Sequence, residues 1–305
     1  MPPLKVRYGI EHLACWLLLK VLGLLPRSLA RPCAGLFLRI LCALTPRLRS
    51  VAARNLELAL PALSPQERHR VIRGVYRSLA RLLTEFSHFP SLTPENLSNV
   101  VTFDGLENYD AALAQGRGVV FLTAHIGAWE LGAFAHGLKG YRLNVVYRAL
   151  DNPALNALVN RYRSLGGNCL IEKSESARGI LAAVARNETV GILADQNTLA
   201  DEGLFVNFFG IPACATAGIA RIALHSGAAV VPAFCVWDAP RKRFRIIYER
   251  ALEFSVSGDT ERDVQTATQQ MAAVIERVVR SYPDQWLWIH RRWKTRPPGQ
   301  PPLYP

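Results

Sequence analysis

The sequence lacks an uninterrupted apolar run of the roughly 20 residues that a membrane-spanning helix requires. It also lacks the motifs H-E-x-x-H and G-x-S-x-G, so neither a metalloprotease-type metal site nor a serine nucleophile on an elbow turn is expected. No two cysteines have C-x-x-C spacing, which argues against a structural zinc site. We expect no metal and no dissociable cofactor. We interpret all six cysteines as small buried apolar residues of a reducing compartment: Cys15, Cys33, Cys42, Cys169, Cys214 and Cys235.

The composition is not that of a disordered chain. Hydrophobic residues make up 50% of the 305 residues and the mean hydropathy is +0.10, which suggests that some apolar surface faces lipid. Acids are few, since 24 Asp and Glu stand against 36 Lys and Arg, a formal net charge of +12. This excess favours an anionic partner: nucleic acid, anionic lipid, a phosphorylated substrate or an acidic carrier protein. Charge alone does not choose among them.

The first 54 residues are both apolar and basic. Two apolar runs, Leu13–Leu25 and Leu29–Leu44, are interrupted by basic side chains, and the segment has nine Lys or Arg but one acid, Glu11. Apolar helices bordered by arginine are typical of a membrane interface on the anionic cytoplasmic side. We therefore predict a membrane-associated helical segment over residues 1–50. The alternatives are one tilted span over residues 8–25 and a buried helical hairpin of a soluble protein.

From residue 100 onward, short apolar runs alternate with amphipathic segments. Continuous apolar strands between helices indicate a parallel sheet that is covered on both faces. We predict an α/β fold with a mainly parallel central sheet flanked by helices, in a domain of residues 51–305 that follows the N-terminal apolar membrane-anchoring helices. The predicted strands are 118–124, 143–147, 169–171, 190–194, 229–237 and 244–248, and the predicted helices are 127–138, 153–165, 176–187, 215–226 and 261–281.

Three polar side chains follow the ends of predicted buried strands. His125 follows the first strand, Arg148 the second and Asp195 the fourth. Sites in open α/β sheets lie beyond the carboxyl ends of the strands. The sequence therefore predicts that these three side chains meet in one cleft.

The segment HIGAWELGAF suggests a catalytic pair. If a helix begins near Gly127, Glu130 lies in its first turn, and its carboxylate can reach back to His125. A carboxylate on one ring nitrogen fixes the tautomer and raises the basicity of the other nitrogen, as in a catalytic triad. A substrate hydroxyl would then be the nucleophile and His125 its general base. A structural histidine is the alternative for this short pattern.

Five segments point to one family when they are taken together. They are TAHIGAWELGAF, YRALDNPALNALVNRYR, GILADQN, FVNFFGIPACATAGIARIA and YPDQWLWIHRRWKTRP, and they span nearly the whole chain. In this order they resemble the lipid A biosynthesis acyltransferases, also called lauroyl/myristoyl acyltransferases, of the lysophospholipid acyltransferase superfamily. The resemblance implies that His125 and Glu130 are catalytic and that Arg148, Asp195 and Gln196 belong to the substrate site.

The resemblance also implies a reaction and a location. The enzyme would move a fatty acyl chain from an acyl thioester, on acyl carrier protein or CoA, to a hydroxyl of a lipid A precursor, which is a phosphorylated glycolipid. It would act at the cytoplasmic face of the bacterial inner membrane, and Arg148 would bind a phosphate or stabilise the oxyanion. Because relatives acylate mannosylated phosphoinositides, a glycerophospholipid or glycosylated phosphoinositide acceptor stays open, as does a non-catalytic membrane-binding protein. A short insert with Asp201 and Glu202 departs from the family pattern, so the loop at the acceptor site is expected to differ.

Two further segments carry candidate binding residues. Between Trp286 and Arg296, tryptophan and basic residues alternate, which suits a lipid headgroup interface or the surface of an acidic carrier protein. Single-stranded nucleic acid binds similar compositions, but no nucleic-acid fold signature accompanies this one, so we expect no such partner. Thr216 is expected to cap the helix over 215–226, whose free amides could hold a phosphate.

Overall fold

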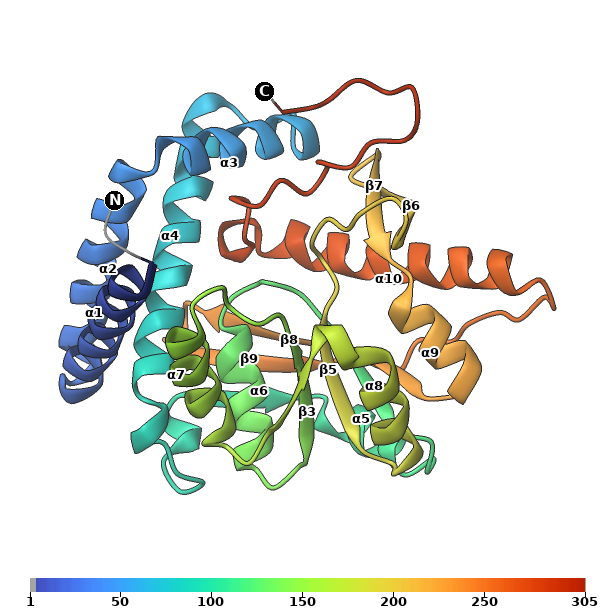
Figure 1. The fold of residues 1–305 in the computed structure, drawn as a ribbon, viewed down its shortest axis with the longest axis horizontal. Helices are drawn as coiled ribbons and strands as arrows, with labels where there is room; N and C mark the ends of the chain where they lie inside the picture. The colour runs from blue at the N-terminus through green and yellow to red at the C-terminus, as the bar shows by residue number, and fades with distance from the viewer. Residues whose placement is uncertain (1–3, 305) are drawn as a thin grey trace.

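The computed structural model describes residues 4–304, apart from the side chains of residues 4, 175 and 176. Its centre is a seven-stranded sheet in the order β1-β9-β8-β2-β5-β3-β4 (Figure 1). All neighbouring strands in it are parallel except β8 and β9, so the predicted mainly parallel sheet is confirmed. The strands are β1 (Val101–Asp104), β2 (Val119–Thr123), β3 (Leu143–Tyr147), β4 (Cys169–Glu172), β5 (Thr189–Leu193), β8 (Ala229–Asp238) and β9 (Arg243–Tyr248).

A separate hairpin was missed by the sequence analysis. It consists of β6 (Gly203–Phe208) and β7 (Ile211–Thr216), which pair in antiparallel fashion outside the central sheet. Its turn is built by two residues with positive φ, Phe209 at 57° and Gly210 at 78°, a geometry that matches the twist of paired strands. Because β7 continues to Thr216, the helix predicted over 215–226 begins only at Gly218.

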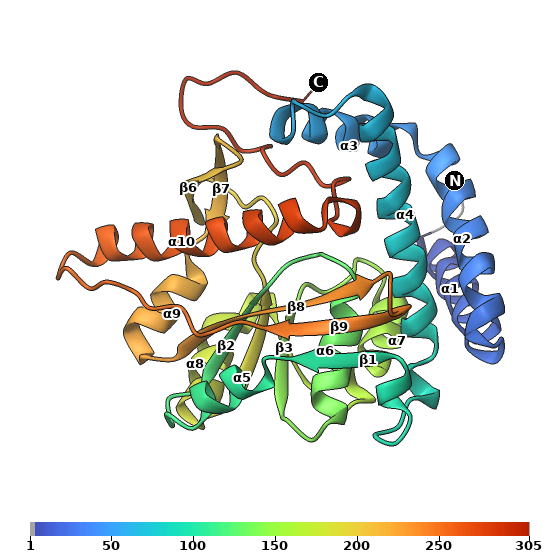
Figure 2. The same cartoon turned by 180° about the vertical axis from the view of Figure 1, so that it is seen from behind.

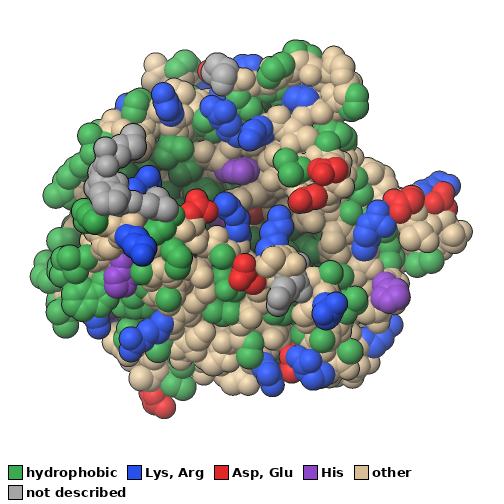
Figure 3. Space-filling view, viewed as in Figure 1, with side chains coloured by type: hydrophobic (Ala, Val, Ile, Leu, Met, Phe, Trp, Pro, Cys, Tyr) green, Lys and Arg blue, Asp and Glu red, His purple; other side chains and the backbone are tan. Residues whose placement is uncertain are grey.

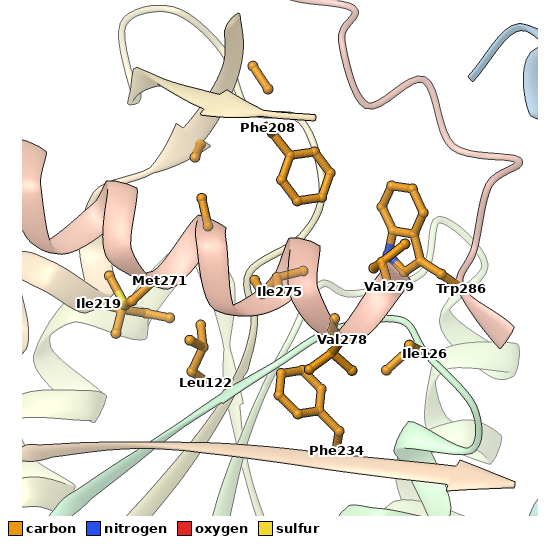
Figure 4. Close-up of a cluster of buried hydrophobic side chains, with 14 of the residues drawn as sticks. Leu122, Ile126, Phe208, Ile219, Phe234, Met271, Ile275, Val278, Val279 and Trp286 are labelled. Atoms are coloured by element: carbon orange, nitrogen blue, oxygen red, sulfur yellow. The ribbon is translucent and has the colours of Figure 1, made fainter. Parts of the chain in front are cut away.

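Helices cover both faces of the sheet. One face carries α5 (Leu106–Leu113), α6 (Trp129–Leu138) and α7 (Pro153–Ser164), and the other carries α8 (Ser176–Ala185), α9 (Gly218–Ser226) and α10 (Thr260–Ser281). Alternate residues of each strand point to opposite faces, so β2 sends Phe121 toward the α6 face and Leu122 toward the α10 face. On that second face, Figure 4 shows Val278 of α10 above Phe234 of β8, with Met271 next to Ile219 of α9 and Val279 next to Trp286.

The long helix α4 (Pro65–Ser87) joins the sheet domain to the N-terminal helices α1 (Leu4–Leu24), α2 (Arg27–Leu44) and α3 (Pro46–Ala59). Its first turn is closed by a capping box between Ser64 and Glu67. Near its other end, the buried carboxylate of Glu85 accepts hydrogen bonds from Arg27 at 2.8 Å and Arg31 at 3.0 Å. A buried charge needs such partners, so these contacts fix α2 against α4, and Figure 2 shows α1 and α2 outside α4.

The outer side of α1 and α2 is an apolar surface. Hydrophobic side chains gather there at the left margin of Figure 3, and exposed apolar patches of this kind mark contact with lipid or protein. The alternative of a buried hairpin therefore does not fit. On α1, α2 and the first turn of α3, the exposed large apolar residues are Val6, Ile10, Leu13, Trp16, Leu17, Val21, Leu24, Leu29, Leu36, Phe37, Ile40, Leu41, Leu44 and Leu48.

Among the described residues, no single helix is long and apolar enough to cross a bilayer. The tilted span over residues 8–25 is therefore not found. The pair α2 and α3, bent by 88° at the break between them, passes the same test of length and composition when its two helices are taken together.

The tryptophans after α10 are inside the protein. Trp288 and Trp293 are 0% exposed, Trp286 is 2% exposed and Arg292 is also buried. The prediction that this cluster faces lipid headgroups is wrong for these four residues. The physical reason is that their polar atoms find partners in the core: the Trp288 indole N–H donates to the Pro283 carbonyl at 2.7 Å, and the Arg292 guanidinium donates to a backbone carbonyl of β7 at 2.6 Å.

The cysteines do not all share one environment. All six thiols are free, but only Cys214 and Cys235 are buried, and Cys33 is exposed on α2. The expectation of six buried cysteines is therefore wrong for the other four. Burial raises the pKa of the Cys235 thiol, so this residue behaves as a small apolar group at the base of the site described below.

Candidate active site

His125 lies directly beyond the carboxyl end of β2, beside the residue that follows β5. The two strands are parallel neighbours with Thr123 opposite Leu193, and the Ala194 N–H extends the pairing by donating to the Thr123 carbonyl at 3.0 Å. Asp195 therefore comes to lie against His125. Its Oδ1 is 2.8 Å from His125 Nδ1, and its Oδ2 accepts the backbone N–H of His125 at 3.0 Å.

This contact sets the protonation of the imidazole. An ionised carboxylate on Nδ1 keeps the proton on that nitrogen and leaves Nε2 as the acceptor. Burial by itself would lower the pKa of His125, but the charge and hydrogen bond of Asp195, with a smaller effect of Glu130, raise it above its ordinary value. His125 is therefore a base of increased strength whose unprotonated nitrogen is Nε2.

Asp195 is itself held by a third donor. The indole N–H of the buried Trp286 donates to Asp195 Oδ2 at 2.8 Å. Burial would raise the pKa of Asp195, but the charge of His125 and the hydrogen bonds from His125 and Trp286 hold it below its ordinary value. The carboxylate thus stays ionised. The prediction of a membrane interface for Trp286 is wrong, and its contact with Asp195 could not be predicted because no local pattern links residues 91 positions apart.

Glu130 does not occupy the position that the sequence analysis expected. Its carboxylate is bound by Arg163 of α7, with Arg163 Nε 3.0 Å from Oε2 and Nη2 2.5 Å from Oε1. The helix α6 begins at Trp129, so Glu130 falls at its second position and faces α7. The expected hydrogen bond between Glu130 and His125 is thus replaced by the contact with Asp195, and Glu130 acts on His125 only through its nearby charge.

The loop after Asp195 is anchored from the C-terminal segment. The Gln196 amide lies 3.4 Å from His125 Nε2, on the side of the ring that faces the cavity. The next residue, Asn197, donates its backbone N–H to His290 Nε2 at 3.0 Å and contacts the Thr295 hydroxyl. Burial lowers the pKa of His290 to about 4, so this histidine is a neutral acceptor that holds the loop.

A cavity of about 470 Å³ opens beside His125 Nε2. His125, Glu130, Arg148 and Gln196 all line it, whereas Asp195 lies behind His125 and is buried. Much of the remaining wall is apolar and belongs to the sheet and to α6, α8 and α9. Figure 3 shows both basic and acidic side chains around a recess near the middle of this face, and the basic ones that line the cavity are Arg148, Arg163 and Lys173. The site therefore combines a base, cations at the rim and an apolar interior.

Arg148 follows β3, as expected, and its side chain is 80% exposed at the cavity rim. It pairs with Asp151 at 3.3 Å. Exposed pairs of this geometry contribute little to stability, so the guanidinium is available to a ligand at low cost.

Comparison with known proteins gives a consistent result. A family model described as bacterial lipid A biosynthesis acyltransferase matches residues 4–295. The chain is 30% identical over 259 residues to the lipid A biosynthesis palmitoleoyltransferase of Escherichia coli (strain K12), and the match covers 85% of this chain and 82% of the relative. It is also 28% identical over 259 residues to the lauroyltransferase of that strain, over 85% and 83% of the two chains, and 24% identical over 252 residues to its myristoyltransferase, over 83% and 77%.

Proposed function

Because this chain belongs to the bacterial lipid A biosynthesis acyltransferase family, we propose that it transfers a fatty acyl chain from an acyl thioester to a hydroxyl of a lipid A precursor, with His125 as general base. The observation that carries the proposal is the buried Asp195 carboxylate on His125 Nδ1, with His125 Nε2 facing an apolar cavity. The donor would be acyl carrier protein or acyl-CoA, and the acceptor a phosphorylated glycolipid.

The proposed reaction is a direct transfer. His125 Nε2 takes the proton of the acceptor hydroxyl while its oxygen forms a bond to the thioester carbonyl carbon. The tetrahedral intermediate then breaks its C–S bond, and the leaving thiolate receives the proton from His125, so an ester and a thiol are formed. Asp195 holds the His125 ring in place and stabilises its protonated form. Glu130 adds a negative charge near the ring, and its ion pair with Arg163 weakens the effect of that charge on His125.

A deletion strain tests the proposed acceptor. Lipid A extracted from bacteria that lack this protein should miss one secondary acyl chain, which mass spectrometry detects as a loss of that chain's mass. Unchanged lipid A, together with a change in the acyl chains of glycerophospholipids or phosphoinositides, would refute a lipid A acceptor.

Arg148 would bind a phosphate or carbonyl oxygen of the substrates. A guanidinium offers planar paired donors that an ammonium lacks. We therefore expect Arg148→Lys to lower kcat/KM at least about tenfold, equivalent to about 1.4 kcal/mol. The control is Asp151→Asn, which removes only the exposed partner and should keep wild-type activity. If Arg148→Lys matches wild type in both kcat and KM, Arg148 does not belong to the substrate site.

Residues 1–50 would attach the enzyme to the cytoplasmic face of the inner membrane, and residues 51–305 would carry out catalysis. Two observations support this arrangement: the apolar outer side of α1 and α2, and the basic side chains of the same segment. Apolar burial in the interface and attraction to anionic headgroups act together at such surfaces. Attachment would therefore need no single spanning helix.

Vesicle binding tests the proposed attachment. The double variant Leu36→Glu and Leu44→Glu replaces two side chains of α2 that are 60% and 74% exposed. We expect its affinity for anionic vesicles to fall at least about tenfold, because each burial is worth about 1.5–3 kcal/mol. Added salt should weaken binding of the wild type. The matched control is Val256→Glu, 75% exposed in the loop before α10, which should bind like wild type. Equal binding of all three proteins would contradict a lipid-facing α2.

A further inference from the structure

The cavity beside His125 extends over both faces of the sheet. Residues of a strand alternate between the faces, and the cavity lining includes members of both sets. We call the part under α6 the α6 arm, and its wall includes Phe121, Ala133, His136, Leu143, Val145 and Tyr248. We call the part next to α8 and α9 the α9 arm, and its wall includes Val146, Ile180, Ile192, Ile219 and Ile222. Both arms meet at the carboxyl ends of β2, β3 and β5, where His125 lies.

The α6 arm is the deeper of the two. Its lining runs from Tyr147, the last residue of β3, to Leu143, the first, a distance of about 13 Å at ~3.3 Å per residue. Aromatic rings form the inner end. The His136 ring lies 4.9 Å from the Phe121 ring, and its Nδ1 is 3.0 Å from the Tyr248 hydroxyl. Burial lowers the pKa of His136 to about 3, so this end is uncharged.

The α9 arm is shallower and starts among polar groups. Ile192 lies next to the last residue of β5, and Ile219 and Ile222 belong to the first turns of α9. At its mouth the cavity is lined by Thr198, Thr216 and Lys173. A reactant that enters this arm would pass hydroxyl groups and a cation before it reaches apolar side chains.

We propose that the two arms hold two different chains during the reaction: the α6 arm takes the acyl chain of the donor, and the α9 arm takes the acyl chain of the acceptor that carries the reacting hydroxyl. The inference rests on the proposed function. Transfer requires two reactants to meet at His125 Nε2, and both carry hydrocarbon. The mouth of the α6 arm holds the Glu130–Arg163 pair, whose charges offset each other, and its uncharged, aromatic inner end suits a chain that ends in a methyl group. The acceptor has a polar, phosphorylated headgroup close to its chain, which matches the polar, cationic mouth of the α9 arm.

Two adjacent residues of β5 allow the arms to be blocked separately. Gly191 faces the α6 arm and Ile192 faces the α9 arm. A Cβ at Gly191 would meet only the methyl groups of Leu143, at 3.5 and 3.9 Å, so a side chain there fits the strand and its further atoms occupy the arm. Gly191→Val and Ile192→Phe are therefore matched variants, and Gly191→Ala and Ile192→Val are their mild counterparts.

The experiment measures kcat/KM for a series of acyl thioesters of different chain length and KM for a phosphorylated glycolipid acceptor. Gly191→Val should lower the kcat/KM of long donors relative to that of short donors at least about tenfold, because the loss of contacts to a few methylene groups lowers kcat/KM by that factor. The KM of the acceptor should stay unchanged. Ile192→Phe should raise the acceptor KM at least about tenfold and keep the wild-type donor profile. Gly191→Ala and Ile192→Val should show smaller changes in the same directions. They keep the test valid if one of the larger substitutions prevents folding.

Either of two results would overturn the two-arm assignment. One is an exchange of the effects, in which Ile192→Phe shifts donor length and Gly191→Val raises the acceptor KM. The other is a donor profile and acceptor KM that neither variant changes. A wild-type protein that transfers no acyl chain to the acceptor would refute the proposed function itself, so the two failures are distinguishable.

Discussion

We expect His125→Ala to lower kcat of acyl transfer by about 10²–10⁴-fold, the range that a positioned general base contributes. The expectation follows from the geometry of the ring, whose Nδ1 is bound to Asp195 at 2.8 Å and whose Nε2 faces the cavity. The substitution removes the imidazole, which is the group at this position that would accept the proton of the hydroxyl. The fold should be unaffected, since the side chain lies at a cavity wall.

The control for this variant is an exposed histidine. His69→Ala changes a surface residue of α4 and should leave the transfer rate unchanged. A His125→Ala protein that folds normally and keeps more than about a tenth of the wild-type rate would remove His125 from the role of general base.

The second large effect is expected at Asp195. In Asp195→Asn the side chain keeps its shape but loses the charge that holds the proton on His125 Nδ1. The amide can donate to that nitrogen instead, which moves the proton to Nε2 and removes the base. We therefore expect kcat to fall by about 10²–10⁴-fold, comparable to removal of the base itself. Glu130→Gln is the matched control, because it removes a carboxylate that binds Arg163 and not the ring. Its loss should be clearly smaller.

The pH profile separates a catalytic effect from a structural one. In the wild type the pKa of His125 is raised, chiefly by Asp195 acting against burial. The base works only when neutral, so kcat/KM should fall as the pH drops through this raised pKa. In Asp195→Asn the pKa of His125 falls, and the acidic limb should move to lower pH. If Glu130→Gln moves the limb more than Asp195→Asn does, Glu130 is the orienting carboxylate and our assignment is wrong.

The sequence predicts the edge of the sheet at which the site forms, but not the contacts within it. Buried apolar strands followed by His125, Arg148 and Asp195 are enough to bring these residues to one edge. The partner of His125 depends on the lateral order of the strands, which places β5 next to β2. Loops and helix starts decide where Glu130 points, and α6 begins two residues later than expected. Sequence spacing alone could not reveal either fact.

The burial of the C-terminal tryptophans is a second feature that could not be predicted from the sequence. A segment rich in tryptophan and arginine, such as the one that contains Trp286, Trp288 and Arg292, fits a membrane interface. It fits equally well a protein core in which buried oxygen atoms accept hydrogen bonds from these side chains. Burial was decided by partners far away in the sequence, namely Asp195 for Trp286 and the Cys214 carbonyl for Arg292. The apolar N-terminal runs predict helices, and the structure has α1 and α2 there, with an exposed apolar side. Their packing against Glu85 of α4 was not predicted.

We propose acyl transfer from a thioester to a lipid A precursor at His125. The most direct measurement is mass spectrometry of a purified phosphorylated glycolipid acceptor after incubation with an acyl thioester and the protein, with fragmentation to locate the new ester. We predict that the wild type adds one acyl chain to a hydroxyl of the acceptor and that His125→Ala adds none at the same enzyme concentration. An acceptor whose mass is unchanged by the wild type, or a product formed equally by His125→Ala, would contradict the account.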